Sequence, residues 1–173
     1  MDYQVEIRYS MFRESKIPNG FYLHFDKLSI GVWFNAKYFR LDITIWNSKE
    51  NYKKVSDIRL APYLRVMLQY IRENEMFFLK KDGFKKDILD VENIKNIDIR
   101  HYQLTQEDIA IISSFPKLLQ FSTTSCFFTD SCNFGYFKGI YTYMDSGSTF
   151  ANMDIFSGFE GQTLKLCGSK IMS

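Results

Sequence analysis

The sequence predicts an α+β protein that begins with an antiparallel β-meander and one helix and continues into a stack of short repeated units with a parallel sheet. Three observations predict this architecture. Apolar and polar residues alternate with period two through much of the first 45 residues, apolar residues recur at helical spacing from 60 to 71, and a strand-like pattern recurs every 21 to 24 residues after residue 93. We therefore divide the chain into a capping domain at residues 1–88 and a repeat segment at residues 89–173.

Four strands are predicted in the capping domain. The first occupies residues 3–11, where every second residue is apolar, and Pro18-Asn19-Gly20 is expected to form a turn before a second alternating run at 21–26. Tight turns at Asp26-Lys27 and Asn35-Ala36-Lys37 are expected to lead into further runs at 28–34 and 39–45. Strands joined in sequence by short turns predict an antiparallel meander.

One helix is predicted after the meander, with Pro62 tolerable only in its first turn. Because an apolar sheet face must be buried against another element, we expect this helix to cover the meander. The connection that follows is expected to contain a short strand at 76–79 and a turn at Asp82-Gly83 within a charged stretch at 80–87. The apolar positions at helical spacing are Leu60, Leu64, Met67, Leu68 and Ile71.

A spacing of buried-type residues repeats through the C-terminal half. Successive copies are offset by 24, 22 and 21 residues, which falls within the roughly 20–29 residues of a unit made of a strand and a return. Thr105 and Asp108 form a helix-start pattern in the first return. The copies are Ile94, Ile97, Ile99, Tyr102 and Leu104; Leu118, Phe121, Thr123, Cys126 and Phe128; Ile140, Tyr143, Asp145, Ser148 and Phe150; and, in part, Leu164, Leu166, Ser169 and Ile171.

This pattern resembles the leucine-rich repeat family, in the variant whose units carry a Cys before a short helix start, as in Cys126-Phe127-Phe128-Thr129-Asp130. The resemblance covers about residues 91–173. It departs from the family at Thr123 and Asp145, which stand where a buried leucine is expected, and in the fourth unit, which has no return. The resemblance implies parallel strands in sequential order near residues 96–100, 120–124, 142–146 and 163–167. An ordinary α/β segment is the alternative.

Leucine-rich repeat proteins bind partners with one exposed face of the parallel sheet, so the resemblance implies a non-enzymatic protein-binding module. This predicted face is mostly small and polar and lacks the Trp and Tyr anchors that concentrate interface energy, so either its affinity is modest or the anchors lie elsewhere. It consists of Asn96, Asp98, Arg100, Gln120, Ser122, Thr124, Thr142, Met144, Ser146, Thr163, Lys165 and Cys167. Tyr22, Trp33, Tyr38 and Trp46 on the polar faces of the meander form a second candidate patch, unless the helix covers them.

The alternative function is a small hydrolase or transferase whose residues meet only in the folded chain. Its candidate members are His101, Asp98, Asp145 and Ser146. The sequence places no nucleophile and base at a local spacing that supports catalysis. We therefore expect surface roles for His101 and for the other histidine, His24, and no loss of activity on His101→Ala.

Composition and cysteine usage limit the partners and cofactors. Of 173 residues, 46% are hydrophobic and 24% are charged, which is typical of a folded domain, and the formal net charge of +2 is too small for a nucleic-acid binder. No apolar run approaches the roughly 20 residues that cross a bilayer, so we expect no membrane contact. Three cysteines without CxxC spacing favour a cytoplasmic protein with no disulfide framework, metal or other cofactor, and with Cys126 buried at a turn.

The last predicted strand, at residues 163–167, is expected to leave an open edge. No further unit follows to pair with its outer backbone groups, and the segment 168–173 is too short to cover them. The apolar residues Leu164, Leu166, Ile171 and Met172 are expected to be partly exposed there. This edge predicts association, either as a homo-oligomer or with an unidentified protein. The alternative is a monomer whose edge is covered by a loop of the third unit.

Overall fold

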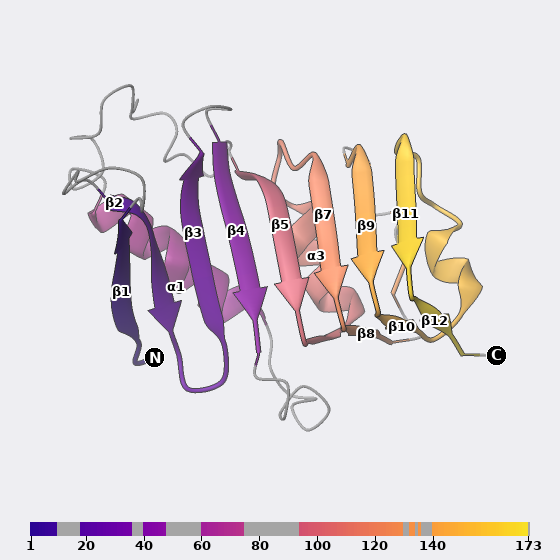
Figure 1. The fold of residues 1–173 in the computed structure, drawn as a ribbon, viewed down its shortest axis with the longest axis horizontal. Coiled ribbons are helices and arrows are strands. Elements are labelled where there is room, and N and C mark those ends of the chain that lie inside the picture. The colour runs from indigo at the N-terminus through magenta and orange to yellow at the C-terminus, as the bar shows by residue number, and fades with distance from the viewer. Residues whose placement is uncertain are drawn as a thin grey trace.

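A computed structural model describes residues 1–9, 18–35, 40–47, 60–74, 94–129, 132, 133, 135 and 140–172 of the chain. The described residues form a mixed α/β fold with one eight-stranded sheet, one four-stranded sheet and two α-helices. Figure 1 shows the long sheet as a row of strands with both helices behind it. The protein therefore has the predicted α+β composition.

Strands of the long sheet follow the order β1-β2-β3-β4-β5-β7-β9-β11, and those of the short sheet follow β12-β10-β8-β6. The long sheet contains β1 (Gln4–Tyr9), β2 (Pro18–His24), β3 (Ser29–Asn35), β4 (Arg40–Trp46), β5 (Ile94–Arg100), β7 (Gln120–Thr124), β9 (Thr142–Ser146) and β11 (Thr163–Cys167). The short sheet contains β6 (Gln103–Leu104), β8 (Phe127–Phe128), β10 (Thr149–Phe150) and β12 (Lys170–Ile171). The helices are α1 (Leu60–Glu73), α3 (Gln106–Ser113) and the 3-10 helix η4 (Met153–Phe156).

Strands β1 to β4 form the predicted meander, since each is antiparallel to the next. The prediction of a turn at Pro18-Asn19-Gly20 is wrong, because β2 already begins at Pro18. Proline is compatible with the first residue of a strand. Gly20 is needed for close packing instead, since a Cβ there would lie 2.3 Å from the carbonyl oxygen of Val32.

Several predicted features of the first half lie outside the described residues. They are the end of the first strand at residues 10–11, residues 36–37 of the turn at Asn35-Ala36-Lys37, the strand at 76–79, the charged stretch at 80–87 with its turn, and the domain boundary at residue 88. Within the described part, the sheet runs without interruption from β4 into β5. One cluster of buried apolar residues spans both halves.

Helix α1 covers the meander as predicted (Figure 1). Its apolar stripe is buried, and its aromatic side chains reach the sheet: the rings of Tyr70 and Phe21 lie 4.8 Å apart, and those of Tyr63 and Phe25 lie 4.9 Å apart. Aromatic pairs at these separations add to the gain from burying their area. The helix therefore covers one side of the meander strands and does not contact the other side of the sheet.

The parallel, sequential order predicted for the four later strands is confirmed, because β5, β7, β9 and β11 each pair in parallel with the next. The first of them also pairs in parallel with β4, for example Ile45 with Ile99. The short sheet, in which β6, β8, β10 and β12 repeat the same order, was not predicted from the sequence. Its strands have only two residues each, too few for a period-two pattern to be recognised.

A left-handed residue marks the corner between the long and the short strand of every unit. His101, Ser125, Gly147 and Gly168 have φ values of 55°, 50°, 74° and 67°. These four positions follow each other at the same offsets of 24, 22 and 21 residues as the sequence pattern. The backbone conformation therefore repeats with the same offsets as the side-chain pattern and gives separate support for the units.

The two polar residues at buried strand positions hydrogen-bond to each other between neighbouring units. Thr123 donates through Oγ1 to Asp145 Oδ1 at 2.7 Å, and Tyr143 donates its hydroxyl proton to Thr123 Oγ1. Asp145 also accepts the backbone N–H of Ser148 at 3.1 Å and the hydroxyl of Ser169 from the fourth unit. Three units therefore meet at one carboxylate that is only 4% exposed.

Asp108 joins the two α-helices. It closes the predicted capping box of α3 by accepting the backbone N–H of Thr105 at 3.0 Å, and it also accepts the first N–H of α1, from Leu60, at 3.3 Å. Burial raises the pKa of the Asp108 carboxyl, and these hydrogen bonds oppose the rise. A single buried side chain thus satisfies donors at the start of both helices.

Candidate functional site

The side of the long sheet opposite α1 forms one continuous surface, which we call the outer face and which is turned toward the viewer in Figure 1. Its side chains stand in three rows of cross-strand partners. The rows are Trp33, Asp42, Asn96, Gln120, Thr142 and Thr163; Tyr22, Gly31, Thr44, Asp98, Ser122, Met144 and Lys165; and His24, Ser29, Trp46, Arg100, Thr124, Ser146 and Cys167.

All the residues predicted for the polar binding face lie in these rows, and the aromatic residues of the meander continue the same rows. The two candidate patches are therefore one surface. The alternative in which the helix covers the aromatic patch is wrong for Tyr22, Trp33 and Trp46, because α1 packs on the opposite face of the sheet. Tyr38 lies outside the described residues.

The aromatic end of the outer face is built around Tyr22. Its ring lies 5.3 Å from that of Trp33 and 5.1 Å from that of Trp46, at interplanar angles of 86° and 87°. Gly31 makes this arrangement possible, since a Cβ there would lie only 2.7 Å from the Tyr22 ring. The aromatic residues were predicted as a patch from the sequence, but Gly31 and Thr44 were not. The pairing of Tyr22 with Gly31 and of Gly31 with Thr44 in the predicted meander could have placed them beside the rings.

A pocket of about 370 Å³ opens between these rings and the end of β5. Its described lining consists of Tyr22, Trp33, Thr44, Trp46, Arg100 and His101, and we call it the anchor pocket. Arg100 donates through Nε to Asp98 Oδ2 at 2.8 Å. The described lining contains an arginine and a histidine but no carboxylate.

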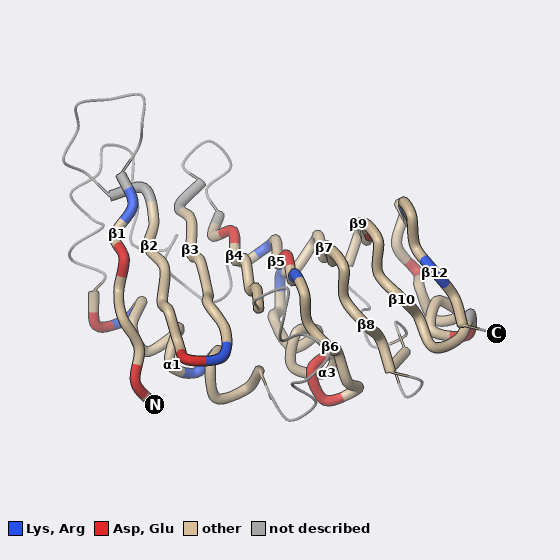
Figure 2. The backbone as a smooth tube through the Cα atoms, turned by 60° about the horizontal axis from the view of Figure 1, so that its bottom comes forward, with Lys and Arg blue, Asp and Glu red and all other residues tan. Residues whose placement is uncertain are grey.

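Charges of both signs surround the aromatic end. The Arg8 guanidinium lies 5.1 Å from the centre of the Tyr22 ring, and its Nη2 is 3.1 Å from Glu6 Oε1. His24 contacts Glu6 through Nε2 at 2.7 Å and Ser29 through Nδ1 at 2.9 Å. Figure 2 shows acidic and basic residues interspersed along the chain. The described surface therefore has no broad field of one sign.

The two carboxylates proposed for a hydrolase or transferase lie on opposite sides of the long sheet. Asp98 is held by Arg100 on the outer face, whereas Asp145 points into the core and is bound there by Thr123 and Ser148. Ser146 lies on β9, two strands from β5, which corresponds to about 10 Å. His101 lines the anchor pocket without either carboxylate beside it in the described lining.

The cysteines divide into two buried thiols and one exposed thiol. Cys126 is 2% exposed, as predicted, and donates through Sγ to the carbonyl oxygen of Ile99 at 3.3 Å. Burial raises the pKa of the Cys126 thiol to about 12, so the thiol is protonated at neutral pH. Cys167 lies exposed on the outer face of β11. In the described ranges, no three His, Cys, Asp or Glu residues gather as metal ligands, and no helix could span a bilayer.

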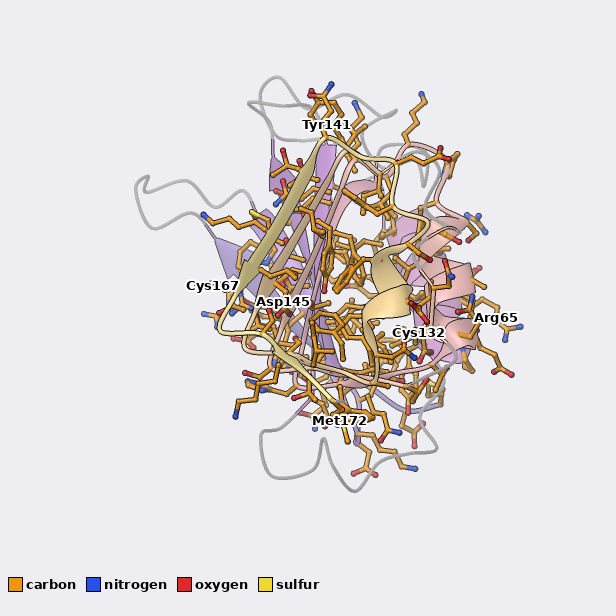
Figure 3. All side chains as sticks on the ribbon, turned by 90° about the vertical axis from the view of Figure 1, so that its right-hand side faces the viewer. Arg65, Cys132, Tyr141, Asp145, Cys167 and Met172 are labelled. Atoms are coloured by element: carbon orange, nitrogen blue, oxygen red, sulfur yellow. The ribbon has the colours of Figure 1, made fainter. Side chains whose placement is uncertain are left out.

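The C-terminal end of the stack is open, as predicted. Figure 3 looks onto this end, where β11 and β12 are the last strands of the two sheets. Leu164, Leu166, Ile171 and Met172 are 41%, 38%, 40% and 55% exposed. The return of the third unit covers part of the interior, because Phe156 of η4 packs on Phe150 with ring centres 4.9 Å apart.

Searches against family models, curated proteins and solved structures find no match for the chain. The resemblance to leucine-rich repeats consequently rests on the chain itself. Three features of the structure favour this resemblance: the sequential parallel strands, the buried positions of the first three units and the recurring left-handed corner. Membership of that family stays a prediction.

Proposed function

We propose that this protein is a non-enzymatic interaction module that binds a protein partner through the outer face, and that its second half is a short leucine-rich-repeat-like stack. The observation that carries the proposal is the merging of the two predicted patches into one surface. Aromatic residues stand on β2, β3 and β4 with Arg100 on the neighbouring strand β5, and mostly small polar residues occupy the outer face of β7, β9 and β11. Interfaces commonly combine a few Trp, Tyr and Arg anchors with surrounding contacts that contribute little energy but exclude water.

The size of the outer face supports binding to a protein. Eight strands spaced by about 4.8 Å extend over about 34 Å, and strands of five to seven residues measure about 17–23 Å. The resulting area of about 700 Å² is close to the roughly 800 Å² that each partner contributes to a standard protein interface. A surface of this size accommodates a folded partner or an extended segment.

The proposal is tested with a charged residue at the centre of the outer face. Proteins captured by the immobilised wild type are purified and titrated against wild type, Ser122→Arg and the control Ala110→Arg, which changes an exposed position on α3. We expect Ser122→Arg to weaken binding at least tenfold and the control to leave it unchanged. A purified partner that binds both variants with wild-type affinity would contradict the proposal.

A second surface is favoured by the open edge of β11, where we propose that two copies of the chain associate. The exposed leucines of this strand give the edge an apolar side that is complementary to itself about a twofold axis. Sedimentation equilibrium at high concentration is expected to show a dimer for wild type and for Lys165→Glu, which changes the outer face of the same strand. Leu166→Asp is expected to be monomeric, with circular dichroism confirming its fold. A wild type that is strictly monomeric would contradict this second proposal.

A further inference from the structure

We propose that the anchor pocket receives one aromatic side chain of the protein partner, with a carboxylate of the neighbouring partner residue bound by Arg100. This inference rests on the proposed protein-binding function and specifies the chemistry of the partner. The shape of the pocket, its charge and the backbone at His101 support it separately.

The shape of the pocket suits a ring. Tyr22 stands nearly perpendicular to both Trp33 and Trp46, so the pocket presents ring faces and ring edges to the same space. Aromatic rings pack well against such a mixture, in offset or edge-to-face contacts. Ligand pockets commonly measure about 300–1,000 Å³. A volume of about 370 Å³ lies near the lower end of that range and matches a single large side chain.

The charge of the described lining favours a partner in which an acidic residue lies next to the aromatic residue. Arg100 uses Nε for Asp98, and its two Nη nitrogens carry further donors that suit a carboxylate. Asp98 and Asp42 stand on the outer face nearby, but neither belongs to the described lining, and Asp98 is already held by Arg100. A cationic ligand would meet Arg100 without a carboxylate in that lining to offset the repulsion.

The backbone at His101 provides the third support. At the same corner of the third and fourth units the chain has Gly147 and Gly168, which adopt the left-handed region without strain. His101 adopts it with a full side chain, and that side chain lines the pocket. Backbone strain of this kind concentrates at binding sites, where a particular side chain is required. Ser125 shares the backbone conformation but is absent from the lining, so the left-handed backbone marks a binding position only at His101, which lies beside the pocket.

The chain contains its own reporter for this pocket, because both of its two tryptophans belong to the lining. We would titrate the full chain with acetyl-Asp-Phe-amide and follow tryptophan emission. The comparison probes are acetyl-Lys-Phe-amide, acetyl-Asp-Ala-amide and phenylacetate. We expect a saturable change with acetyl-Asp-Phe-amide in the millimolar range, as is usual for a ligand of this size, and at least fivefold weaker binding of the other three probes.

Substitutions in the lining test whether the change in tryptophan emission reports binding in the anchor pocket. Arg100→Gln is expected to weaken acetyl-Asp-Phe-amide at least fivefold, and His101→Gly is expected to weaken it as well. Arg65→Gln, at an exposed position of α1 on the opposite side of the sheet, is the matched control and is expected to leave binding unchanged. If Arg100→Gln unfolds in circular dichroism, Arg100→Lys, which keeps the charge but loses the planar fork, takes its place with the same expectation.

Three results would overturn the inference. The first is tighter binding of acetyl-Lys-Phe-amide, which would show a pocket for cations. The second is phenylacetate binding as tightly as the peptide, which would show a site for free aromatic acids. The third is the absence of an emission change with every probe. The third result would leave the Ser122→Arg test of the whole outer face untouched, so the two proposals fail separately.

Discussion

The meander and the parallel stack fill their interiors differently. In the meander, the described core-facing side chains of β2, β3 and β4 are all apolar, and α1 packs against them. In the stack, Thr123, Asp145 and Ser148 occupy buried positions and are satisfied by hydrogen bonds within and between units. Burying polar groups is tolerable only when they find partners. In the stack, the strand and corner residues of successive units supply those partners to one another.

Among substitutions that test this difference, Asp145→Ala is expected to have the largest effect on stability. Removing the carboxylate leaves the hydroxyls of Thr123 and Ser169 and the N–H of Ser148 without their acceptor, and we expect a loss of about 3 kcal/mol in the free energy of unfolding. Urea denaturation measures the loss. In the meander, Ile30→Val is the comparison, with an expected cost of about 1 kcal/mol. A loss at Asp145 no larger than that at Ile30 would contradict the structural role of the buried carboxylate.

Asp108 tests the junction between the two regions. Because its pKa is raised in the folded protein, the stability that this group contributes is present at acidic pH and is lost as the pH rises through that raised pKa. Asp108→Ala removes hydrogen bonds at the start of both helices and is expected to cost about 2 kcal/mol at acidic pH.

The cost of Asp108→Ala should diminish as the pH rises above the pKa of the carboxyl, since wild type then buries a charge. Unfolding in urea at several pH values measures both proteins. A matched series with Glu160→Ala, an exposed carboxylate in the return of the third unit, provides the control. A cost that grows with rising pH would show that the carboxylate is stabilised in the fold, contrary to the expectation.

Much of this architecture could be predicted from the sequence, because local patterns determine most of it. Strand alternation, the apolar spacing of α1 and the offsets of the units require no knowledge of distant contacts. Thr123 and Asp145 first looked like departures from the repeat, because their hydrogen bonds join residues 20 and 22 positions apart. The anchor pocket was missed for the same reason, since it joins β2, β3 and β4 to the end of β5.

The left-handed corners give a smaller test within the stack. Gly147→Ala is expected to cost about 1 kcal/mol, because a side chain is strained at its φ of 74°. Ser125→Gly at the equivalent corner is expected to change the stability by less than about 0.5 kcal/mol, since relief of strain offsets the added freedom of the unfolded chain. Thermal unfolding compares them. Equal effects of the two substitutions would contradict the equivalence of the corners.

The last prediction concerns thiol reactivity, which distinguishes residues on the outer face from buried residues without changing the stability of the protein. Cys167 is expected to react with iodoacetamide in the native protein, whereas Cys126, with its pKa raised to about 12, and the buried Cys132 are expected to react only after unfolding. Peptide mass spectrometry identifies the modified residue. Modification of Cys126 before Cys167 would place the β7 corner at the surface.

The corner also determines where the chain tolerates insertions. Two residues separate the long strand from the short strand in all four units, whereas the returns that follow shorten from 15 to 13 to 12 residues. All of the variation in unit length therefore lies in the returns. One residue added at a corner would reverse which side chains of the short strand point inward, whereas one added to a return need not change the register of either sheet. Added residues are thus expected to be tolerated in the returns and to disrupt the short sheet at the corners.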